Sequence, residues 1–273
     1  MSNVRITFLG TGAGNCIYRS HTAIVLDWSN GARILLDAGS GNSVLKNGAQ
    51  MGILAQDFQQ VLLTHQHGDH MGGLPHIQGQ RNLVAPQAPP LQVYGSEEAL
   101  RKVQRLFEAT SITHAVDQDG VTTVDGRQVV RWQPGQEGVW ASLNGGIRAT
   151  PFPVDHIPGA VGWRIESDGV SVVFSGDTRF CPRLAEAAQG ATVLIHEVLS
   201  TESDKEGARR RGHSTAAEAA RIAAQAGVSQ LIITHIDSPF HLNTQPLVDE
   251  ARQIYDGPIS VANDLYQVTV ARQ

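Results

Sequence analysis

The chain has 273 residues, of which 41% are hydrophobic and 17% are charged. These proportions are typical of a globular protein with a sizeable core, and they exclude a disordered or coiled-coil chain. The formal net charge of -5 does not favour a surface adapted throughout to nucleic acid, although a local basic patch would be compatible with it.

Neither membrane contact nor disulfide bonding is expected. The longest apolar stretches, such as 170–174 and 231–233, are far too short to cross a bilayer, and the first residues lack the order of a signal peptide. We therefore expect a cytoplasmic protein. The two cysteines, Cys16 and Cys181, form no CxxC pair, so we expect free thiols rather than a disulfide framework or a thiolate zinc site.

The first half of the chain predicts short strands and two helices. Strands are indicated where β-rich apolar runs end at Gly, Asn or Asp. The predicted strands are 4–9, 22–27, 33–37, 60–64 and 91–94, and the predicted helices are 42–52 and 97–107. A loop with three prolines, 85–90, precedes the last of these strands.

The second half predicts further strands and one helix that is defined at both ends. Strands and turns alternate over 121–146, and single strands follow at 147–152, 159–165, 171–175, 193–197, 231–234, 259–262 and 265–270. Helices are predicted at 183–189 and 246–255, and 201–212 is interpreted as a charged loop. The clearest helix starts after Thr215, where Glu218 completes a capping box, and it ends at Gly227.

Two segments share one pattern, an apolar strand that ends in Thr-His, at 61–65 and 231–235. Because no short period repeats along the chain, this pattern favours a duplicated β/α layout over a solenoid. Two sheets covered by helices are the natural architecture. We expect a single domain over residues 1–273, or two fused halves that share a core.

The chemistry concentrates in the run His65-Gln66-His67-Gly68-Asp69-His70, directly after the predicted strand 60–64. Its three imidazoles and one carboxylate are ligands that zinc, manganese and iron accept. A turn of this kind could serve two metal ions. The alternative is a chance polar surface loop, which does not account for the density of ligand types.

Three more candidate ligands stand at other strand ends: His156, Asp177 and His235. A single histidine at a strand end is more often a hydrogen-bonded structural residue than a metal ligand. The coincidence of all three with the first cluster favours ligation, because a pair of ions needs more donors than one turn supplies.

This ordered set of motifs resembles the metallo-β-lactamase superfamily. The set consists of the HxHxDH run, a later His, Gly-Asp-Thr at 176–178 and Thr-His at 234–235, and it spans nearly the whole chain. The segments 8–14, 162–166 and 212–215 are similar to the branch that contains ribonuclease Z, certain phosphodiesterases and arylsulfatases. The resemblance implies an α/β fold, the four-layer αβ/βα sandwich of this superfamily.

The resemblance also implies a hydrolase with two divalent metal ions, with zinc expected first and manganese or iron as alternatives. The implied ligands form two groups around one bridging carboxylate: His65, His67 and His156 for one ion, Asp69, His70 and His235 for the other, and Asp177 between them. A water between the ions would lose a proton and attack in line, while the ions neutralise charge on the transition state. Asp69 could also accept a proton.

His213 directly precedes the capped helix, where free backbone amides and the positive end of the helix dipole favour an anion. An imidazole there could stabilise a phosphoryl or sulfuryl group, or protonate the leaving oxygen. The resemblance assigns such a catalytic role to the matching histidine, with Glu197 as its acidic partner. The alternative is an ordinary polar residue in front of a helix.

Two further features admit more than one interpretation. The loop 10–14 lacks the Gly-Lys-Ser/Thr ending of a P-loop, and it more simply makes a tight turn under the active site. The run Arg209-Arg210-Arg211 could draw an anionic substrate toward His213, or it could be a solvated loop.

Two departures from ribonuclease Z guide the functional hypothesis. The segment between His156 and Asp177 is too short for the long arm that clamps transfer RNA in that family. The family's loop that contains Pro and Lys is also missing, and residues 15–21 stand in its place. We therefore expect first a hydrolase of small phosphodiesters or related anionic esters. The alternatives are a transfer RNA 3′ processing endonuclease without the arm, a lactonase or thioesterase, and a binding protein without turnover. Nucleic acid is not the favoured partner, and a homodimer is compatible with the resemblance.

Overall fold

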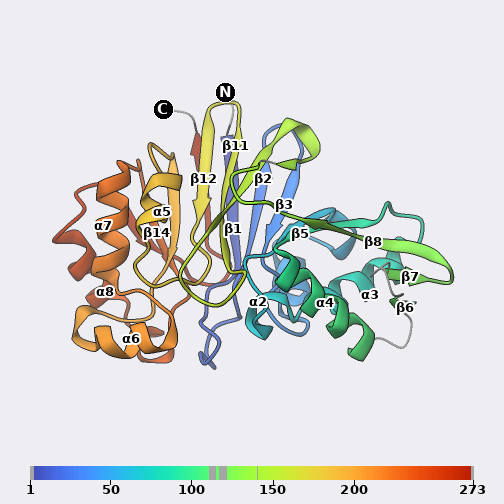
Figure 1. Cartoon of the computed structure of the whole chain (residues 1–273), viewed down its shortest axis with the longest axis horizontal. Helices are drawn as coiled ribbons and strands as arrows, with labels where there is room; N and C mark the ends of the chain where they lie inside the picture. The colour runs from blue at the N-terminus through green and yellow to red at the C-terminus, as the bar shows by residue number, and fades with distance from the viewer. Residues whose placement is uncertain (1–2, 111–114, 117–121, 140, 272–273) are drawn as a thin grey trace.

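The computed structural model describes residues 3–110, 115–116, 122–139 and 141–271, and within these ranges the chain forms two mixed sheets (Figure 1). The first sheet holds, in spatial order, β16 (Gln267–Ala271), β1 (Asn3–Gly10), β2 (Ala23–Trp28), β3 (Arg33–Leu36), β4 (Gln60–Leu62), β5 (Leu91–Gly95), β8 (Arg127–Pro134), β7 (Thr122–Val124) and β6 (Ala115–Val116). The second holds β15 (Ile259–Val261), β14 (Leu231–Thr234), β13 (Val193–Glu197), β12 (Val170–Phe174), β11 (Val161–Ser167), β10 (Arg148–Pro153) and β9 (Ala141–Ser142).

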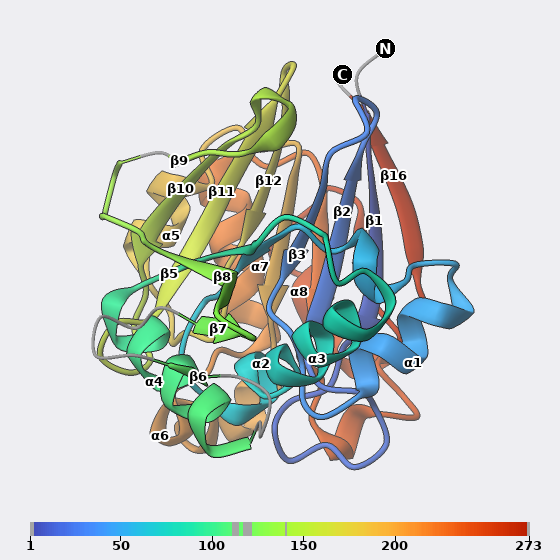
Figure 2. The same ribbon diagram turned by 90° about the vertical axis from the view of Figure 1, so that its right-hand side faces the viewer.

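Helices cover the outer face of each sheet, as Figure 1 shows, and Figure 2 looks onto the helices of the first sheet. On the first sheet lie α1 (Ser43–Gln50), α3 (Leu74–Val84) and α4 (Glu97–Thr110), and on the second lie α5 (Pro182–Ala187), α7 (Ala216–Ala226) and α8 (Gln245–Arg252). The short helices α2 (Gly68–Met71) and α6 (Lys205–Arg211) lie at one end of the molecule. None of the helices in the described ranges has both the length and the apolar character that a membrane crossing needs.

The core between the two sheets is built from the inward faces of both. Phe8 and Ile24 from the first sheet belong to the same buried cluster as Trp163 and Ile195 from the second. The Trp163 indole N–H also donates a 3.0 Å hydrogen bond to the Leu63 carbonyl oxygen, so the two sheets are joined by a polar contact as well as by apolar burial. The resulting order, helices, sheet, sheet, helices, confirms the predicted four-layer αβ/βα sandwich.

One prediction about local structure is wrong, and one helix was missed. The segment 201–212, expected as a loop, contains α6, because Gly207 does not break the helix: it is buried, and a Cβ there would lie 2.2 Å from an Asp204 carboxylate oxygen. The helix α3 was not predicted, since Gln, Asn and Gly interrupt its apolar face, but its buried residues Leu74 and Ile77 pack into the core of the first half.

Parallel pairing brings the ends of key strands to one edge of the molecule. In the first sheet β4 pairs in parallel with β3 and β5, and in the second β13 pairs in parallel with β12 and β14. The carboxyl ends of parallel strands meet at the same edge of a sheet. The two Thr-His repeats lie at the ends of β4 and β14, and His65 and His235 both come close to Asp177 there.

Candidate functional site

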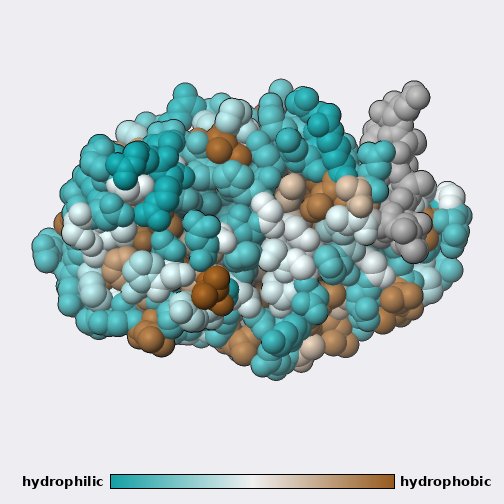
Figure 3. All heavy atoms as spheres, turned by 90° about the horizontal axis from the view of Figure 1, so that it is seen from below, coloured by the Kyte–Doolittle hydropathy of each residue, from teal (hydrophilic) through white to brown (hydrophobic). Residues whose placement is uncertain are grey.

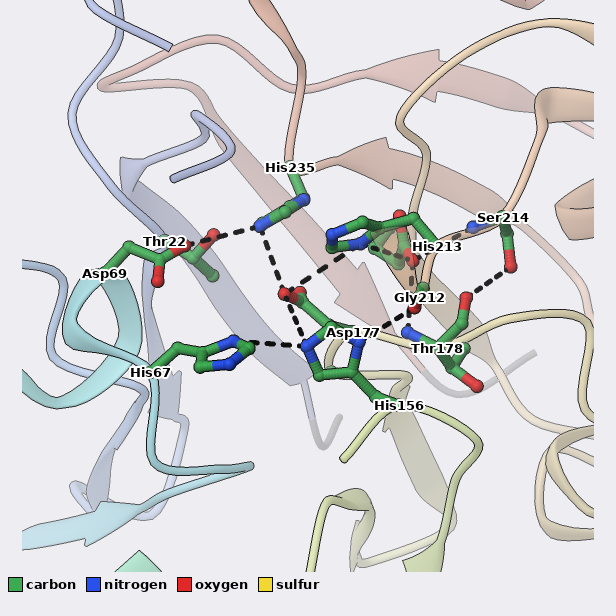
Figure 4. A network of polar contacts seen from close by, with 12 residues as sticks. Thr22, His67, Asp69, His156, Asp177, Thr178, Gly212, His213, Ser214 and His235 are labelled. Atoms are coloured by element: carbon green, nitrogen blue, oxygen red, sulfur yellow. Dashed lines mark hydrogen bonds and ion pairs between the residues drawn. The ribbon is translucent and has the colours of Figure 1, made fainter. Parts of the chain in front are cut away.

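The predicted site residues gather around a cavity of about 300 Å³ at the strand ends. His67, Asp69, Asp177, His213 and His235 all line it. Figure 4 shows these side chains converging from both halves of the molecule on the Asp177 carboxylate. The structure thus brings together residues that are up to 170 positions apart in the chain, from His65 to His235 (235 − 65 = 170).

Three imidazoles form the first donor group. The Nδ1 atom of His67 lies 3.0 Å from Nε2 of His65 and 3.1 Å from Nε2 of His156. The chain stays extended at His67 and then turns into α2, so the side chains on either side of the turn point in different directions. Asp177 Oδ2 completes this group at 3.6 Å from His65 Nε2 and 3.8 Å from His156 Nε2.

The second donor group shares the same Asp177 oxygen. Nε2 of His70 lies 3.2 Å and Nε2 of His235 lies 3.3 Å from Asp177 Oδ2. Asp69 Oδ2 lies 3.4 Å from His70 Nε2 and 3.6 Å from His235 Nε2. Within each of the two groups, all donor atoms lie within 4.8 Å of one another, so each group has the dimensions of a metal site.

Hydrogen bonds behind the donor groups fix which imidazole nitrogen faces the cavity. The His156 Nδ1–H donates to the Gly212 carbonyl oxygen at 2.8 Å, and Nδ1 of His70 lies 2.7 Å from Asp37 Oδ2. His65 Nδ1 contacts the Thr64 hydroxyl at 3.0 Å, and that hydroxyl donates to Asp37. With their Nδ1 atoms engaged, His65, His70 and His156 present Nε2 to the site, as metal-binding histidines require.

Asp37 is a supporting residue that the sequence reasoning missed. Its carboxylate is fully buried and accepts hydrogen bonds from the Thr64 backbone N–H and hydroxyl, both at 2.8 Å. Its backbone is left-handed, with φ of 53°, as is that of His235, with φ of 59°. Such non-glycine residues carry a backbone cost and cluster at functional sites. An aspartate at the end of the predicted strand 33–37 was the available signal.

Burial and mutual charge perturb the titration of these groups. Burial lowers the pKa of His65 well below its usual value, and the neighbouring His70 adds to this effect. For Asp177 burial alone would raise the pKa, but His235 and His70 overcome it and hold the pKa well below the usual range. Perturbations of this kind in one cavity are typical of functional sites.

The residues fit a pair of divalent cations. His70 Nε2, Asp177 Oδ1 and His235 Nε2 are buried without a hydrogen-bond partner, and such groups are costly unless something satisfies them. The lone pairs of His65 Nε2, His67 Nδ1 and His156 Nε2 would also repel one another if none of these nitrogens carried a proton, because His67 Nδ1 lies within 3.1 Å of the other two. Nitrogen and oxygen donors at these positions suit zinc, manganese or iron, and this donor set does not separate the three.

His213 and Glu197 form a second feature of the site, beside Asp177. Nδ1 of His213 lies 3.1 Å from Glu197 Oε1 and 4.0 Å from Asp177 Oδ2. Glu197 is buried and also accepts from the backbone N–H groups of Thr178 and Ser214. Burial would lower the pKa of His213, but the Glu197 carboxylate outweighs it and raises the pKa to about 9.

The capped helix behind His213 is confirmed. The Thr215 hydroxyl accepts from the Glu218 backbone N–H at 3.2 Å, and the Glu218 carboxylate accepts from the Thr215 N–H at 3.2 Å. Helix α7 then ends at Gly227 in a left-handed conformation. The reciprocal hydrogen bonds fix the direction in which the chain enters α7, and therefore where His213 stands.

The structure separates the arginines at the end of α6. Arg211 lines the cavity and pairs with Asp237 at 3.2 Å and with Asp204 at 3.1 Å. Arg209 pairs instead with the buried Glu218 at 3.3 Å. Arg211 is therefore placed to attract an anionic substrate, which was one of the two interpretations of this run.

Two glycines allow close approach at the site. The Cys16 N–H donates to the Ala13 carbonyl oxygen at 2.8 Å, which agrees with the predicted tight turn, and a Cβ at Gly14 would lie 2.9 Å from Asp69 Oδ2. At Gly212, where φ is 91°, a Cβ would lie only 2.5 Å from Nδ1 of His156. Side chains at either position would displace a donor group.

Comparison with known proteins agrees with this geometry. The profile of the β-lactamase superfamily domain matches residues 32–236. Ribonuclease Z of Mycolicibacterium gilvum is 31% identical over 98% of this chain and 96% of its own, and that of Mycobacterium marinum is 32% identical over 98% and 99%.

Solved structures agree on the fold. The metallo-β-lactamase fold protein YhfI of Bacillus subtilis superposes with a TM-score of 0.80 at 19% identity, covering 98% of this chain and 99% of that one. The short form of human tRNase Z gives 0.74 at 21% identity, with the same coverage. The chain therefore belongs to the metallo-β-lactamase superfamily, in the branch that contains ribonuclease Z and related phosphodiesterases.

Proposed function

We propose that this protein is a metal-dependent phosphodiesterase with a dinuclear site. The observation that carries the proposal is the single carboxylate of Asp177, which two separate donor groups share. A carboxylate between two such groups suits a pair of ions held a few ångströms apart, as in other two-metal hydrolases.

The ligands proposed for the two ions are those of the two donor groups: His65, His67 and His156 for one, Asp69, His70 and His235 for the other, and Asp177 for both. When bound, the ions would supply an activated water and neutralise charge on the reacting group. Asp69 lines the cavity and is proposed to accept a proton as well. We keep zinc as the expected metal, with manganese or iron as alternatives.

His213 is proposed to act on the substrate itself. Glu197 engages Nδ1, which leaves Nε2 of His213 as the atom that can meet a substrate oxygen. The Glu197 carboxylate raises the pKa of this imidazole and so favours its protonated form. A positive donor there can stabilise an anionic phosphoryl group or protonate the leaving oxygen. This preference for an anionic centre makes a lactonase or thioesterase a weaker alternative.

Processing of transfer RNA 3′ ends is the second candidate function. The two mycobacterial relatives named ribonuclease Z align with 98% of this 273-residue chain over only 282 and 288 positions, so the alignments leave little room for an inserted arm. The missing arm therefore does not separate this chain from them. These relatives make nucleic acid a stronger candidate substrate than the charge of the chain suggests. The cytoplasmic location, the single domain and the homodimer stay predictions.

The first experiment measures metal content together with hydrolysis. Protein purified without chelator should contain about two ions per chain and should hydrolyse bis(p-nitrophenyl) phosphate faster than p-nitrophenyl sulfate or a neutral p-nitrophenyl ester. Removing the metal should abolish diester hydrolysis, and adding zinc or manganese should restore it. Diester turnover that survives complete removal of metal would refute the proposal, and preference for the neutral ester would redirect it to acyl substrates.

A further inference from the structure

Two loops form one side of the cavity mouth, and they are held together. The first, 13–20, contributes Asn15 to the cavity wall, and the second, 236–243, contributes Asp237. The Ser238 hydroxyl donates to the Asn15 carbonyl oxygen at 3.3 Å, and the Ala13 N–H donates to the Ile236 carbonyl oxygen at 3.1 Å. Tyr18 and His241, at the tips of these loops, are three and four residues along the chain from the cavity-lining Asn15 and Asp237.

These tips expose large apolar side chains. The exposed fractions are 82% for Ile17, 62% for Tyr18 and 90% for Leu242. Figure 3 shows the molecule from below, with separate hydrophobic groups standing out from a largely hydrophilic face. Exposed apolar groups beside a binding cavity often mark a ligand contact.

The Tyr18 ring has one face covered and the rest open. Its centroid lies 3.7 Å from that of His241, with a tilt of 33° between the planes. Since Tyr18 is still 62% exposed, the face away from His241 is accessible. A phenol ring backed by an imidazole is a flat surface on which another ring can stack.

Arg19 makes this arrangement rigid. Its guanidinium donates to the His241 carbonyl oxygen at 3.2 Å, to the Thr11 hydroxyl at 3.0 Å and to the Ala262 carbonyl oxygen at 2.8 Å. The side chain next to Tyr18 in sequence thus ties both loops to the body of the protein. Stacking of a ligand ring on Tyr18 would cost little conformational entropy, because these hydrogen bonds already hold the loops.

We propose that Tyr18, backed by His241, is a stacking platform for a nucleobase of the substrate, an inference that rests on the proposed phosphodiesterase function. A nucleotide ester or a nucleic acid strand could place its phosphodiester at the donor groups and one of its bases on Tyr18 at the same time. Stacking on an aromatic ring accepts every base, since each presents a flat π face. The platform therefore selects nucleotide esters without selecting a base.

The test compares two ligands that differ by the base alone, adenosine 5′-monophosphate and ribose 5-phosphate. Calorimetric titration of the metal-loaded protein should give binding of the nucleotide that is tighter by about tenfold or more. Y18A should abolish this difference without changing metal content, and Y18F should retain it. The matched control is L83A, which removes another exposed apolar side chain, 78% exposed, on α3.

Three outcomes would overturn the platform. They are equal or unmeasurable binding of the two ligands by the unmodified protein, a Y18A protein that still prefers the nucleotide, and an equal loss in Y18A and L83A. A fourth, a change of mass in light scattering caused by Y18A, would show that the tips join two copies of the chain. Hydrolysis of bis(p-nitrophenyl) phosphate by the unmodified protein reports separately on the proposed function, because the binding comparison requires no turnover.

Discussion

The two halves of the molecule supply the site in different ways. The first sheet places four donor side chains within six residues of one turn after β4, from His65 to His70. The second sheet supplies Asp177, Glu197 and His235 from the ends of three neighbouring strands, β12, β13 and β14. One half concentrates its ligands locally, and the other depends on strand pairing to assemble them.

This difference determines what each half contributes. The turn after β4 presents ligands to both donor groups, since His65 and His67 belong to one and His70 to the other. The second half adds one imidazole to each group, His156 and His235, and the carboxylate that both groups share. It also supplies the His213 and Glu197 pair beside that carboxylate. Metal affinity should thus depend on both halves, whereas the proposed contact with the reacting group depends on the second.

The largest effect is expected when the shared residue is removed. Asp177→Ala should lose both ions and nearly all diester hydrolysis, because several kcal/mol of charge stabilisation disappear, roughly a thousandfold or more in rate. Metal analysis and bis(p-nitrophenyl) phosphate assays report the two losses. Retention of two ions per chain would disprove the proposed ligand set.

The second half alone is tested by His213→Gln. The ions should remain, while kcat for diesters falls about 100-fold to 1,000-fold, since a positioned donor to the reacting group is lost. Metal content measured on the same preparation separates this role from ligation. An unchanged kcat would remove His213 from the reaction, and loss of metal would instead point to ligation by Glu197, His213 and His235, whose donor atoms also lie close together.

A smaller effect is expected from the support behind the first half. Asp37→Asn keeps the size of the side chain but weakens its hydrogen bond to His70, so metal affinity should fall about 10-fold to 100-fold, a typical cost for such outer contacts. Competition with a chromogenic chelator gives the affinity. The matched variant Asp27→Asn, at a partly buried carboxylate of β2 that pairs with Arg5 and Arg33, should leave the metal affinity unchanged.

Local pattern was enough to predict the strands and most of the helices. The β-rich runs and the Thr215 capping box correspond to observed elements because their signals lie within a few neighbouring residues. Helix α6 was wrongly expected as a loop, since only the packed structure shows that Gly207 is accommodated. Helix α3 was missed for a related reason, as its burial depends on the first sheet.

For the candidate site, too, local motifs could be predicted and contacts made only by folding could not. The structure brings the seven predicted ligands, from His65 to His235, together with His213 and Glu197. Asp37 was missed because a lone aspartate after a strand gives no local sign that it will meet His70. The Tyr18 and His241 pair was also out of reach, since only folding places residues 223 positions apart (241 − 18) ring to ring.

Gly212 limits how this sequence can diverge. Its carbonyl oxygen orients His156, and its α-carbon passes so close to the same imidazole that only a hydrogen atom fits there. Arg210, two residues earlier, is exposed, but a side chain at 212 would push the imidazole away from its partners. We therefore expect related sequences to vary at the mouth of the cavity and to keep glycine at position 212.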